Sequence, residues 1–212
     1  MKKNVRGREP QSGAVVVSGV RLPQPRATWI PILTAAASFV ISIYTFFVTS
    51  RPPDVEVISP RQIRVAQGGE GGAWVYAQPV LVASGRGERA EVVLDIRMHV
   101  EPLATAGGVD FRWDEVGTWQ YDPVSQELGW TFLSDPSPLL FTAQTAQAPV
   151  LLFIGPPDWQ FEGGTYRIVI EVDRAVDPQP ARATLQITLS DPQVRVLDES
   201  GGRRFLTIMA DG

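Results

Sequence analysis

An uninterrupted apolar stretch at residues 28–50, TWIPILTAAASFVISIYTFFVTS, constrains this chain more than any other feature. It contains 23 residues and no charged side chain. A helix of about 20 apolar residues spans the hydrocarbon core of a bilayer. Trp29 lies at one end and Tyr44 near the other, where aromatic side chains favour the membrane interface. Pro52 and Pro53 follow the stretch and prevent the helix from continuing. We therefore predict one transmembrane helix.

The charges on either side of this helix predict its orientation. Residues 1–27 contain six Lys or Arg residues and one Glu, so we expect a cytoplasmic N-terminus and a disordered basic tail. A cleavable signal peptide is the alternative, with Val48 and Ser50 as acceptable residues before a cleavage site. The apolar run exceeds the usual signal-peptide length of about 7–15 residues, which favours an uncleaved anchor. Both alternatives place residues 51–212 outside the cytoplasm, in a periplasmic or extracellular position.

Composition narrows the choice of partners. Residues 51–212 contain 13 Arg and 22 acidic residues, a net charge of −9, whereas the whole chain has −4. An acidic domain repels phosphates, which argues against nucleic acid. The basic tail is explained by topology or by anionic lipid, so the lipid bilayer is the first expected partner. The chain has no cysteine, which excludes disulfides, thiolate metal sites and cysteine nucleophiles.

A stripe of weakly polar residues follows one face of the predicted helix. Thr34, Ser38 and Ser42 recur every four residues. Small and hydroxyl-bearing residues let membrane helices approach closely, so this stripe is a candidate packing face for a second helix. Alternatively, each hydroxyl donates to the carbonyl four residues earlier and has no partner outside its own helix.

After residue 53 the apolar pattern changes to a period of two, which predicts an all-β domain over residues 51–212. The clearest alternation is at residues 90–100, where Val92 and Ile96 face one way and Asp95 and Arg97 the other. Further strands are expected at residues 55–65 with a break at Ser59 and Pro60, and at 74–83, 139–143, 149–155, 164–173 and 181–190. Short strands separated by Gly and Pro turns indicate an antiparallel sandwich.

Residues 164–172, GTYRIVIEV, followed by a turn and the alternating strand 181–190, resemble the last two strands of bacterial immunoglobulin-like or fibronectin type III-like domains. In that family a tyrosine at the corner enters the penultimate strand, and Tyr166 matches its position. The resemblance covers mainly residues 161–190 and implies an immunoglobulin-like scaffold, which does not specify a function. Residues 109–133 and an expected C-terminal hairpin, 193–197 with 205–209, depart from the family pattern.

Enzymatic candidates are few. His99 is the single histidine, so a zinc site would lack ligands, and no Gly-x-Ser-x-Gly elbow is present. Asp110, Asp114, Glu115 and Asp122 could bind Ca²⁺ or act as glycosidase carboxylates. The Asp-x-Asp-x-Asp-Gly spacing is absent, however, so we favour the interpretation that these residues are solvated acids in turns. We expect a non-enzymatic protein without a cofactor.

The main candidate site is an aromatic meander of three strands, at residues 109–114, 118–122 and 128–133, with a turn at residues 115–117 and another at 123–127. Its rings form three i, i+2 pairs: Phe111 with Trp113, Trp119 with Tyr121, and Trp130 with Phe132. If the strands are neighbours, the six rings gather into one patch. Facing inward the patch is core, and facing outward it is a platform for a sugar, a protein or the bilayer surface.

These features together predict a membrane-anchored module, outside the cytoplasm, that binds a protein partner as an accessory subunit of a larger membrane or envelope complex. The alternative is a binding module for a glycan or cell-wall polymer, in which the aromatic patch would contact the sugars.

Overall fold

The computed structural model describes residues 26–68, 72–105, 107–124, 126–201 and 204–211, with side chains from residue 29 onward. Most of the predicted disordered tail lies outside these residues. The chain divides into two compact units, with the boundary between Ile43 and Tyr44. Helix α1 (Arg26–Thr49) is long and apolar enough between Trp29 and Thr49 to cross a membrane. It is therefore a candidate membrane anchor or signal sequence.

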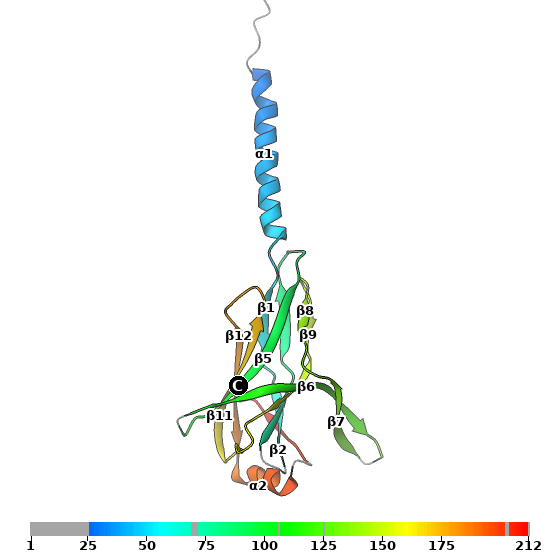
Figure 1. The fold of residues 1–212 in the computed structure, drawn as a ribbon, viewed down its shortest axis with the longest axis vertical. Coiled ribbons are helices and arrows are strands. Elements are labelled where there is room, and N and C mark those ends of the chain that lie inside the picture. Colours follow the sequence, from blue (N-terminus) through cyan, green and yellow to red (C-terminus); the bar gives the residue numbers. More distant parts are fainter. Residues whose placement is uncertain (1–25, 69–71, 106, 125, 202–203, 212) are drawn as a thin grey trace, which may run out of the picture. The chain divides into compact units, whose positions relative to one another are not determined.

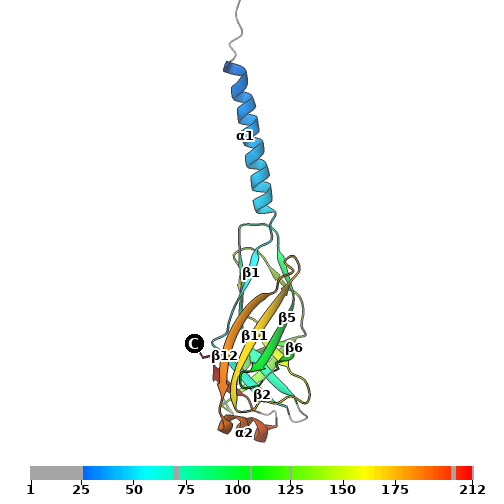
Figure 2. The ribbon, with the colours of Figure 1, turned by 90° about the vertical axis from the view of Figure 1, so that its left-hand side faces the viewer.

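The second unit is mostly antiparallel β structure (Figures 1 and 2). Its strands are β1 (Asp54–Ile58), β2 (Gln62–Gln67), β3 (Ala73–Ala77), β4 (Val80–Ser84), β5 (Glu91–Pro102), β6 (Val109–Asp122), β7 (Glu127–Ser134), β8 (Leu139–Phe141), β9 (Ala146–Gln147), β10 (Val150–Ile154), β11 (Gly164–Arg174), β12 (Ala181–Leu189) and β13 (Leu206–Met209). One short helix, α2 (Asp191–Ser200), lies between β12 and β13.

The strands form two sheets. The smaller has the order β1-β4-β9, and the larger has the order β12-β11-β5-β6-β10-β3-β2-β13, with β7 paired to β6 and β8 to β5. Beyond β13, the Asp211 N–H donates to the Gln186 carbonyl of β12 at 2.8 Å, which brings the two ends of the larger sheet together. The larger sheet is therefore nearly a barrel, a shape that removes exposed strand edges.

Prolines stand at three of the places where the chain passes from one sheet to the other. Pro60 separates β1 from β2, Pro79 separates β3 from β4, and Pro149 separates β9 from β10. Proline has no N–H to donate to a ladder, so pairing stops there and the strand can bend. The strands expected at 55–65 and 74–83 are thus each divided between the two sheets.

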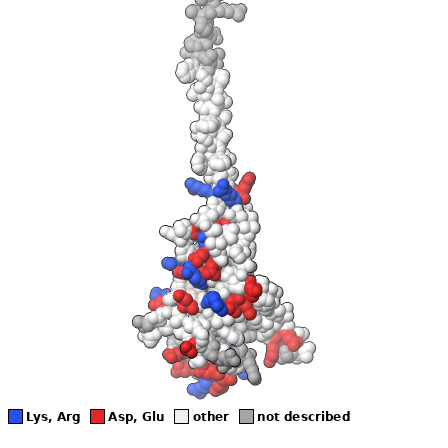
Figure 3. Space-filling model, in the orientation of Figure 1, with Lys and Arg blue, Asp and Glu red and all other residues white. Residues whose placement is uncertain are grey.

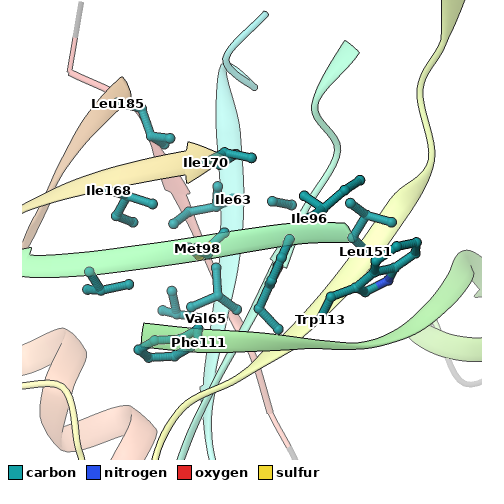
Figure 4. Close-up of a cluster of buried hydrophobic side chains, with 14 of the residues drawn as sticks. Ile63, Val65, Ile96, Met98, Phe111, Trp113, Leu151, Ile168, Ile170 and Leu185 are labelled. Carbon is teal, nitrogen blue, oxygen red and sulfur yellow. The ribbon is translucent and has the colours of Figure 1, made fainter. Parts of the chain in front are cut away.

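The core lies mainly within the larger sheet (Figure 4), and the smaller sheet adds Val55, Leu81 and Ala83 to the same cluster. Its fully buried side chains come in alternation from β2, β5, β6, β10, β11 and β12, and include Ile63, Val65, Ile96, Met98, Phe111, Leu151, Ile168 and Ile170. The alternation expected for residues 164–173 is present, and that expected for residues 90–100 is present from Ile96 to Val100. Before Ile96 the expectation is wrong, because Val93 is buried in place of Val92 and Leu94 is exposed. The pairing of β5 with β11 shifts at this point, with Asp95 opposite Asp173 but Val93 opposite Arg174. Without disulfides, burial of these apolar side chains is the main source of stability.

The structure differs from the sequence-based expectation at residues 193–197, which belong to helix α2 and not to a hairpin. Ser190 precedes the helix, and both its N–H and its hydroxyl donate to Gln193 Oε1 at 2.8 Å. Gly201 ends the helix in a left-handed conformation with φ 54°. Leu197 is fully buried and packs against the core. The Ser-x-x-Gln capping pattern thus favours a helix in a segment whose apolar residues also alternate.

The side chain of Tyr166, near the start of β11, bonds the backbone of the preceding loop at residue 162. Its hydroxyl donates to the Glu162 carbonyl at 2.9 Å and accepts from the Glu162 N–H at 2.8 Å. The ring is buried, and this burial is the main cause that raises the pKa of the phenol. One side chain therefore fixes the path by which the chain enters β11.

We expect Tyr166→Phe to lower the free energy of unfolding by about 1 kcal/mol, because both hydrogen bonds to residue 162 are lost while the ring remains. Urea unfolding of the full chain in detergent, followed by circular dichroism, measures the change. Tyr121→Phe is the matched control, since its ring is 61% exposed, and it should leave the midpoint unaltered. Equal effects of the two substitutions would contradict a structural role for the corner.

Candidate functional site

Strands β6 and β7 form a two-stranded ribbon that leaves the larger sheet and extends sideways from it (Figure 1). Residue pairing runs from Gly117 opposite Phe132, through Trp119 opposite Trp130, to Asp122 opposite Glu127. Side chains alternate along each strand, so one face is apolar and the other polar. The apolar face, called here the ribbon apolar face, consists of Gly117, Trp119, Tyr121, Leu128, Trp130 and Phe132.

The ribbon is one continuous strand followed by a second, not the expected three-strand meander. No turn occurs at residues 115–117, because β6 continues through them to Asp122. Gly117 instead makes room for a ring: a Cβ at this position would lie 2.3 Å from Trp130 Cζ2. The glycine that suggested a turn is required by a close side-chain contact.

A β-bulge decides which way the aromatic side chains of β6 point. Opposite β10, Trp113 pairs with Phe153 but Glu115 pairs with Leu152, so Asp114 is the extra residue. Before the bulge, Phe111 and Trp113 face the core and are almost fully buried. After the bulge, the side chains that face outward are those of Glu115, Gly117 and Trp119. Leu152 of β10 lies on the same side and belongs to a second apolar cluster, separate from the main core.

This second cluster, the outer aromatic cluster, consists of Tyr76, Trp119, Trp130 and Phe205, with Arg64 against it. The Tyr76 ring centroid lies 5.0 Å from that of Trp119 and 4.9 Å from that of Trp130. Trp119 lies 5.2 Å from Trp130 and 4.6 Å from Phe205. Such tilted and edge-on contacts between aromatic rings are favourable beyond the apolar area they bury. The cluster attaches the base of the ribbon to the outer surface of β2 and β3.

Polar groups border the outer aromatic cluster. The guanidinium of Arg64 lies 4.4 Å from the centre of the Trp119 ring, and burial lowers its pKa. Trp130 Nε1 donates to Glu115 Oε2 at 2.8 Å. Burial, followed by the negative charge of Glu115, raises the pKa of Tyr76 to about 12. The phenol is therefore neutral at physiological pH.

The six predicted platform residues do not form one patch. Phe111 and Trp113 are core, and Trp119 and Trp130 are half-buried in the outer aromatic cluster. Tyr121 is 61% exposed and Phe132 is 51% exposed. The i, i+2 pairs do share faces, but the bulge turns the first pair away from the other two.

The exposed part of the ribbon combines apolar side chains with an unpaired strand edge. The pairing of β6 with β7 contains a bulge, because Val116 lies opposite Ser134 and Gly117 opposite Phe132, so that Leu133 is the extra residue. Leu133 is exposed, as are Tyr121, Phe132 and, in the turn, Val124. Among the described strands, β7 pairs only with β6. Residues 113–135 contain five acidic residues and no Lys or Arg. An exposed strand edge beside an apolar face is suited to pairing with another chain.

Sequence analysis alone missed Arg64, Tyr76 and Phe205 as neighbours of the tryptophans. The available signal is alternation in β2 and β3, where Arg64 and Tyr76 stand between fully buried residues and so face the outside. A large aromatic side chain at an outward position indicates that something covers that face. Which strands provide the cover depends on the sheet order, which alternation does not reveal.

The other chemical candidates are dispersed. His99 Nδ1 lies 2.7 Å from Asp110 Oδ1, and Asp114 pairs with Arg112 at 2.9 Å. At about 3.3 Å per residue, Asp110 and Asp122 lie at opposite ends of a strand roughly 40 Å long. Within the described ranges, no three His, Asp or Glu side chains are grouped as metal ligands would be.

A cavity of about 550 Å³ lies between the loop after β5 and the loop before β11. Trp159 lines it, together with Asp158 and Glu162. The Trp159 ring packs edge-on against Phe111 and Phe161 at centroid distances of 5.2 and 4.7 Å, so its orientation is fixed. A volume of this order falls within the range of small-molecule sites, in which a few polar groups accompany apolar and aromatic side chains.

Two of the three hydroxyls of the α1 stripe, those of Thr34 and Ser42, bond within their own helix. Thr34 Oγ1 donates to the Ile30 carbonyl at 2.9 Å, and Ser42 Oγ donates to the Ser38 carbonyl at 2.8 Å. These bonds match the alternative of self-satisfied hydroxyls. Packing against a second helix stays a prediction.

Substitution of the predicted platform residues should separate core from surface. We expect Phe111→Ala to lower the free energy of unfolding by about 3–5 kcal/mol, because it opens a cavity in the packed core. Phe132→Ala, at an exposed position, should change it by about 0.5 kcal/mol or less. Denaturant titration of both variants measures the difference, and a comparable loss at the two positions would contradict this division of the aromatic residues.

Comparisons with protein-family models, with curated protein sequences and with solved structures find no match to this chain. Its function is therefore inferred from its own residues.

Proposed function

We propose that this chain is a non-enzymatic, single-pass membrane protein whose β domain, outside the cytoplasm, binds a protein partner through the β6–β7 ribbon. Helix α1 is the anchor in this proposal, because residues 28–50 have no charge and six basic residues precede them. The same charge bias supports a cytoplasmic N-terminus. The protein would serve as an accessory subunit of a larger membrane or envelope complex.

The observation that supports binding is the ribbon apolar face, which continues beyond the outer aromatic cluster into exposed residues. Tyr121 and Phe132 are more than half exposed, and β7 has a free edge among the described strands. A partner segment in extended conformation would add a strand to β7 through main-chain hydrogen bonds. Its alternate side chains would then cover Phe132, Trp130 and Leu128.

Charge indicates the composition of that segment. Asp122 and Glu127 lie on the ribbon face opposite the aromatic residues, and no basic residue accompanies them in residues 113–135. A segment that alternates apolar with Lys or Arg residues would place its apolar side chains on the ribbon apolar face and its positive charges beside these carboxylates. Complementary charge of this kind mainly increases the association rate and selects the partner.

The scaffold in this proposal is an immunoglobulin-like sandwich that has been extended into a barrel. The tyrosine corner at Tyr166 and the long β11–β12 pair support the relationship. The smaller sheet, β1-β4-β9, would be the second layer of the sandwich. The β6–β7 ribbon and α2 with β13 would be additions to that pattern.

A synthetic peptide of alternating Val and Lys residues tests this function with the full chain in detergent. We expect it to bind, whereas a Val/Glu peptide of the same length should not. The double variant Tyr121→Ser, Phe132→Ser should weaken binding by about tenfold or more, because exposed aromatic anchors dominate such interfaces. Fluorescence anisotropy of the labelled peptide measures the affinity.

The matched control is Gln120→Ala with Thr131→Ala, on the polar face of the same ribbon. It should bind the Val/Lys peptide like the unaltered chain. Equal binding of both peptides, or equal loss in both double variants, would contradict the proposal. Isolation of the chain only as a monomer after mild detergent extraction of its native membrane would contradict the role as a subunit.

The cavity beside Trp159 favours a second candidate function, binding of a glycan or cell-wall polymer. If it operates, the full chain is retained on insoluble peptidoglycan, and Asp158→Asn with Glu162→Gln reduces retention several-fold through loss of hydrogen-bonded carboxylates. The ribbon variant Tyr121→Ser, Phe132→Ser serves as the control and should be retained normally. If the unaltered chain is not retained on insoluble peptidoglycan, this second candidate function is contradicted.

A further inference from the structure

The turn between β4 and β5 packs against the end of α1. The Glu88 N–H donates to the Thr49 carbonyl, the last residue of the helix, at 3.0 Å. Gly87 allows this approach, since a Cβ there would lie 1.8 Å from the Arg51 carbonyl oxygen. Gly85, with φ 137°, lies against Pro53. Backbone contacts therefore hold this turn at the position where the chain leaves the helix.

Three exposed arginines gather at this turn: Arg51, Arg86 and Arg89. None of them has an ion-pair partner among the described residues, which is also true of Arg61, Arg64, Arg195 and Arg204, whereas Arg97, Arg112, Arg167, Arg174 and Arg182 are paired. Glu88 lies between Arg86 and Arg89 in the sequence, and Asp54, three residues after Arg51, pairs with Arg174. Figure 3 shows basic side chains, with an acidic one, just beyond the end of α1.

The rest of the domain has the opposite charge. Without Arg51, Arg86, Arg89 and Glu88, residues 51–212 contain 10 Arg and 21 acidic residues, a net charge of −11. Acidic side chains are concentrated at the α2 end of the face in Figure 3, away from the β4–β5 turn. The charge of the domain is thus divided along its length.

The position of the turn follows from the helix, on the proposed premise that α1 spans the bilayer. The apolar part, Trp29–Thr49, has 21 residues and a length of about 31 Å at about 1.5 Å per residue, which matches the hydrocarbon core. Thr49 then lies at the level of the lipid headgroups. Any group bonded to Thr49 lies at that level too.

We propose that Arg51, Arg86 and Arg89 form a collar that binds the phosphate groups of anionic phospholipids in the leaflet beside the β domain. A guanidinium matches phosphate geometry and forms paired, charge-assisted hydrogen bonds with it. The same leaflet repels the acidic remainder of the domain. Both forces orient the β domain with its β4–β5 turn at the lipid surface and its α2 end away from the lipid.

Energy transfer from the domain to labelled lipid tests the collar. Glu199 in α2 is exposed and the chain has no cysteine, so Glu199→Cys gives one site for a donor dye. The full chain is placed in nanodiscs of phosphatidylcholine with or without phosphatidylglycerol, with acceptor dye on a headgroup. With phosphatidylglycerol, we expect a narrow distribution of long donor-to-lipid distances, and a broader one without it.

The variant Arg51→Gln, Arg86→Gln, Arg89→Gln should broaden the distribution in phosphatidylglycerol nanodiscs. Each arginine near an anionic surface changes the equilibrium between the oriented domain and a domain tilted toward the lipid by about fivefold. Removal of three arginines should therefore raise the population of tilted domains on the order of a hundredfold at low salt. High salt should act on the unaltered chain in the same direction. The matched control is Arg61→Gln, Arg195→Gln, Arg204→Gln, which removes equal charge from exposed positions elsewhere and should leave the distribution narrow.

Identical distributions for the unaltered chain and the collar variant would overturn the collar, as would equal broadening by the control. In both cases the chain is inserted and binding of the Val/Lys peptide is unaffected, so the proposed function stands. Failure of the chain to incorporate into nanodiscs would instead refute the anchor, and the collar with it.

Discussion

The domain depends on the hydrogen-bond ladder of three long strands, β5, β11 and β12. β11 lies between the other two and pairs with both over most of its length. At one end of the ladder, Arg174 pairs with Asp54 of β1 and with Asp177, which ties the smaller sheet to the larger. At the other end, β5 pairs with β6, the next strand of the larger sheet, and Asp211 reaches β12. A chain without disulfides thus gains its rigidity from sheet closure and a continuous core.

Sheet closure also determines where a free edge remains. In the larger sheet, the end strands are brought together by Asp211, so their main-chain groups are not open along their whole length. β7 lies off this path because β6 bends away from the barrel after its pairing with β10. The bulge at Asp114 and the small residue Gly117 make that departure possible. The exposed edge is therefore a consequence of specific residues in β6 and not of an incomplete barrel.

Sequence alone predicted the elements whose pattern is local and unambiguous. The uncharged stretch gave the helix, and alternation gave the strands at residues 90–100, 164–173 and 181–190. The sequence-based prediction was wrong at α2. There Val194 and Val196 follow the two-residue period of a strand, whereas Ser190, Gln193 and Gly201 are the residues that begin and end a helix. For ten residues the two periods are hard to distinguish, and the capping residues were the better signal. The order of the strands was beyond reach, because alternation shows which side is buried but not which strand is adjacent.

The same limit applies to the candidate site. Each aromatic pair in the ribbon was correctly expected to share a face, since i and i+2 residues point the same way. A single bulge residue, Asp114, reverses the faces between Trp113 and Trp119, and nothing in the local sequence marks it. Likewise Gly117 has the composition of a turn, but its function is to admit the Trp130 ring. Contacts between distant residues decided both outcomes.

An isolated two-stranded ribbon is at best marginally stable in water, so the exposed half of β6–β7 needs support from its base. Tyr76, Trp119 and Trp130 provide it by packing three rings within 5.2 Å of one another, with Arg64 against the outer side. This packing restricts the angle of the ribbon and leaves Tyr121 and Phe132 in a defined place. A surface that is ordered before binding loses less conformational entropy when a partner arrives. In the proposed function, the half-buried tryptophans would therefore contribute to binding by positioning the ribbon, while its exposed residues would make the contact.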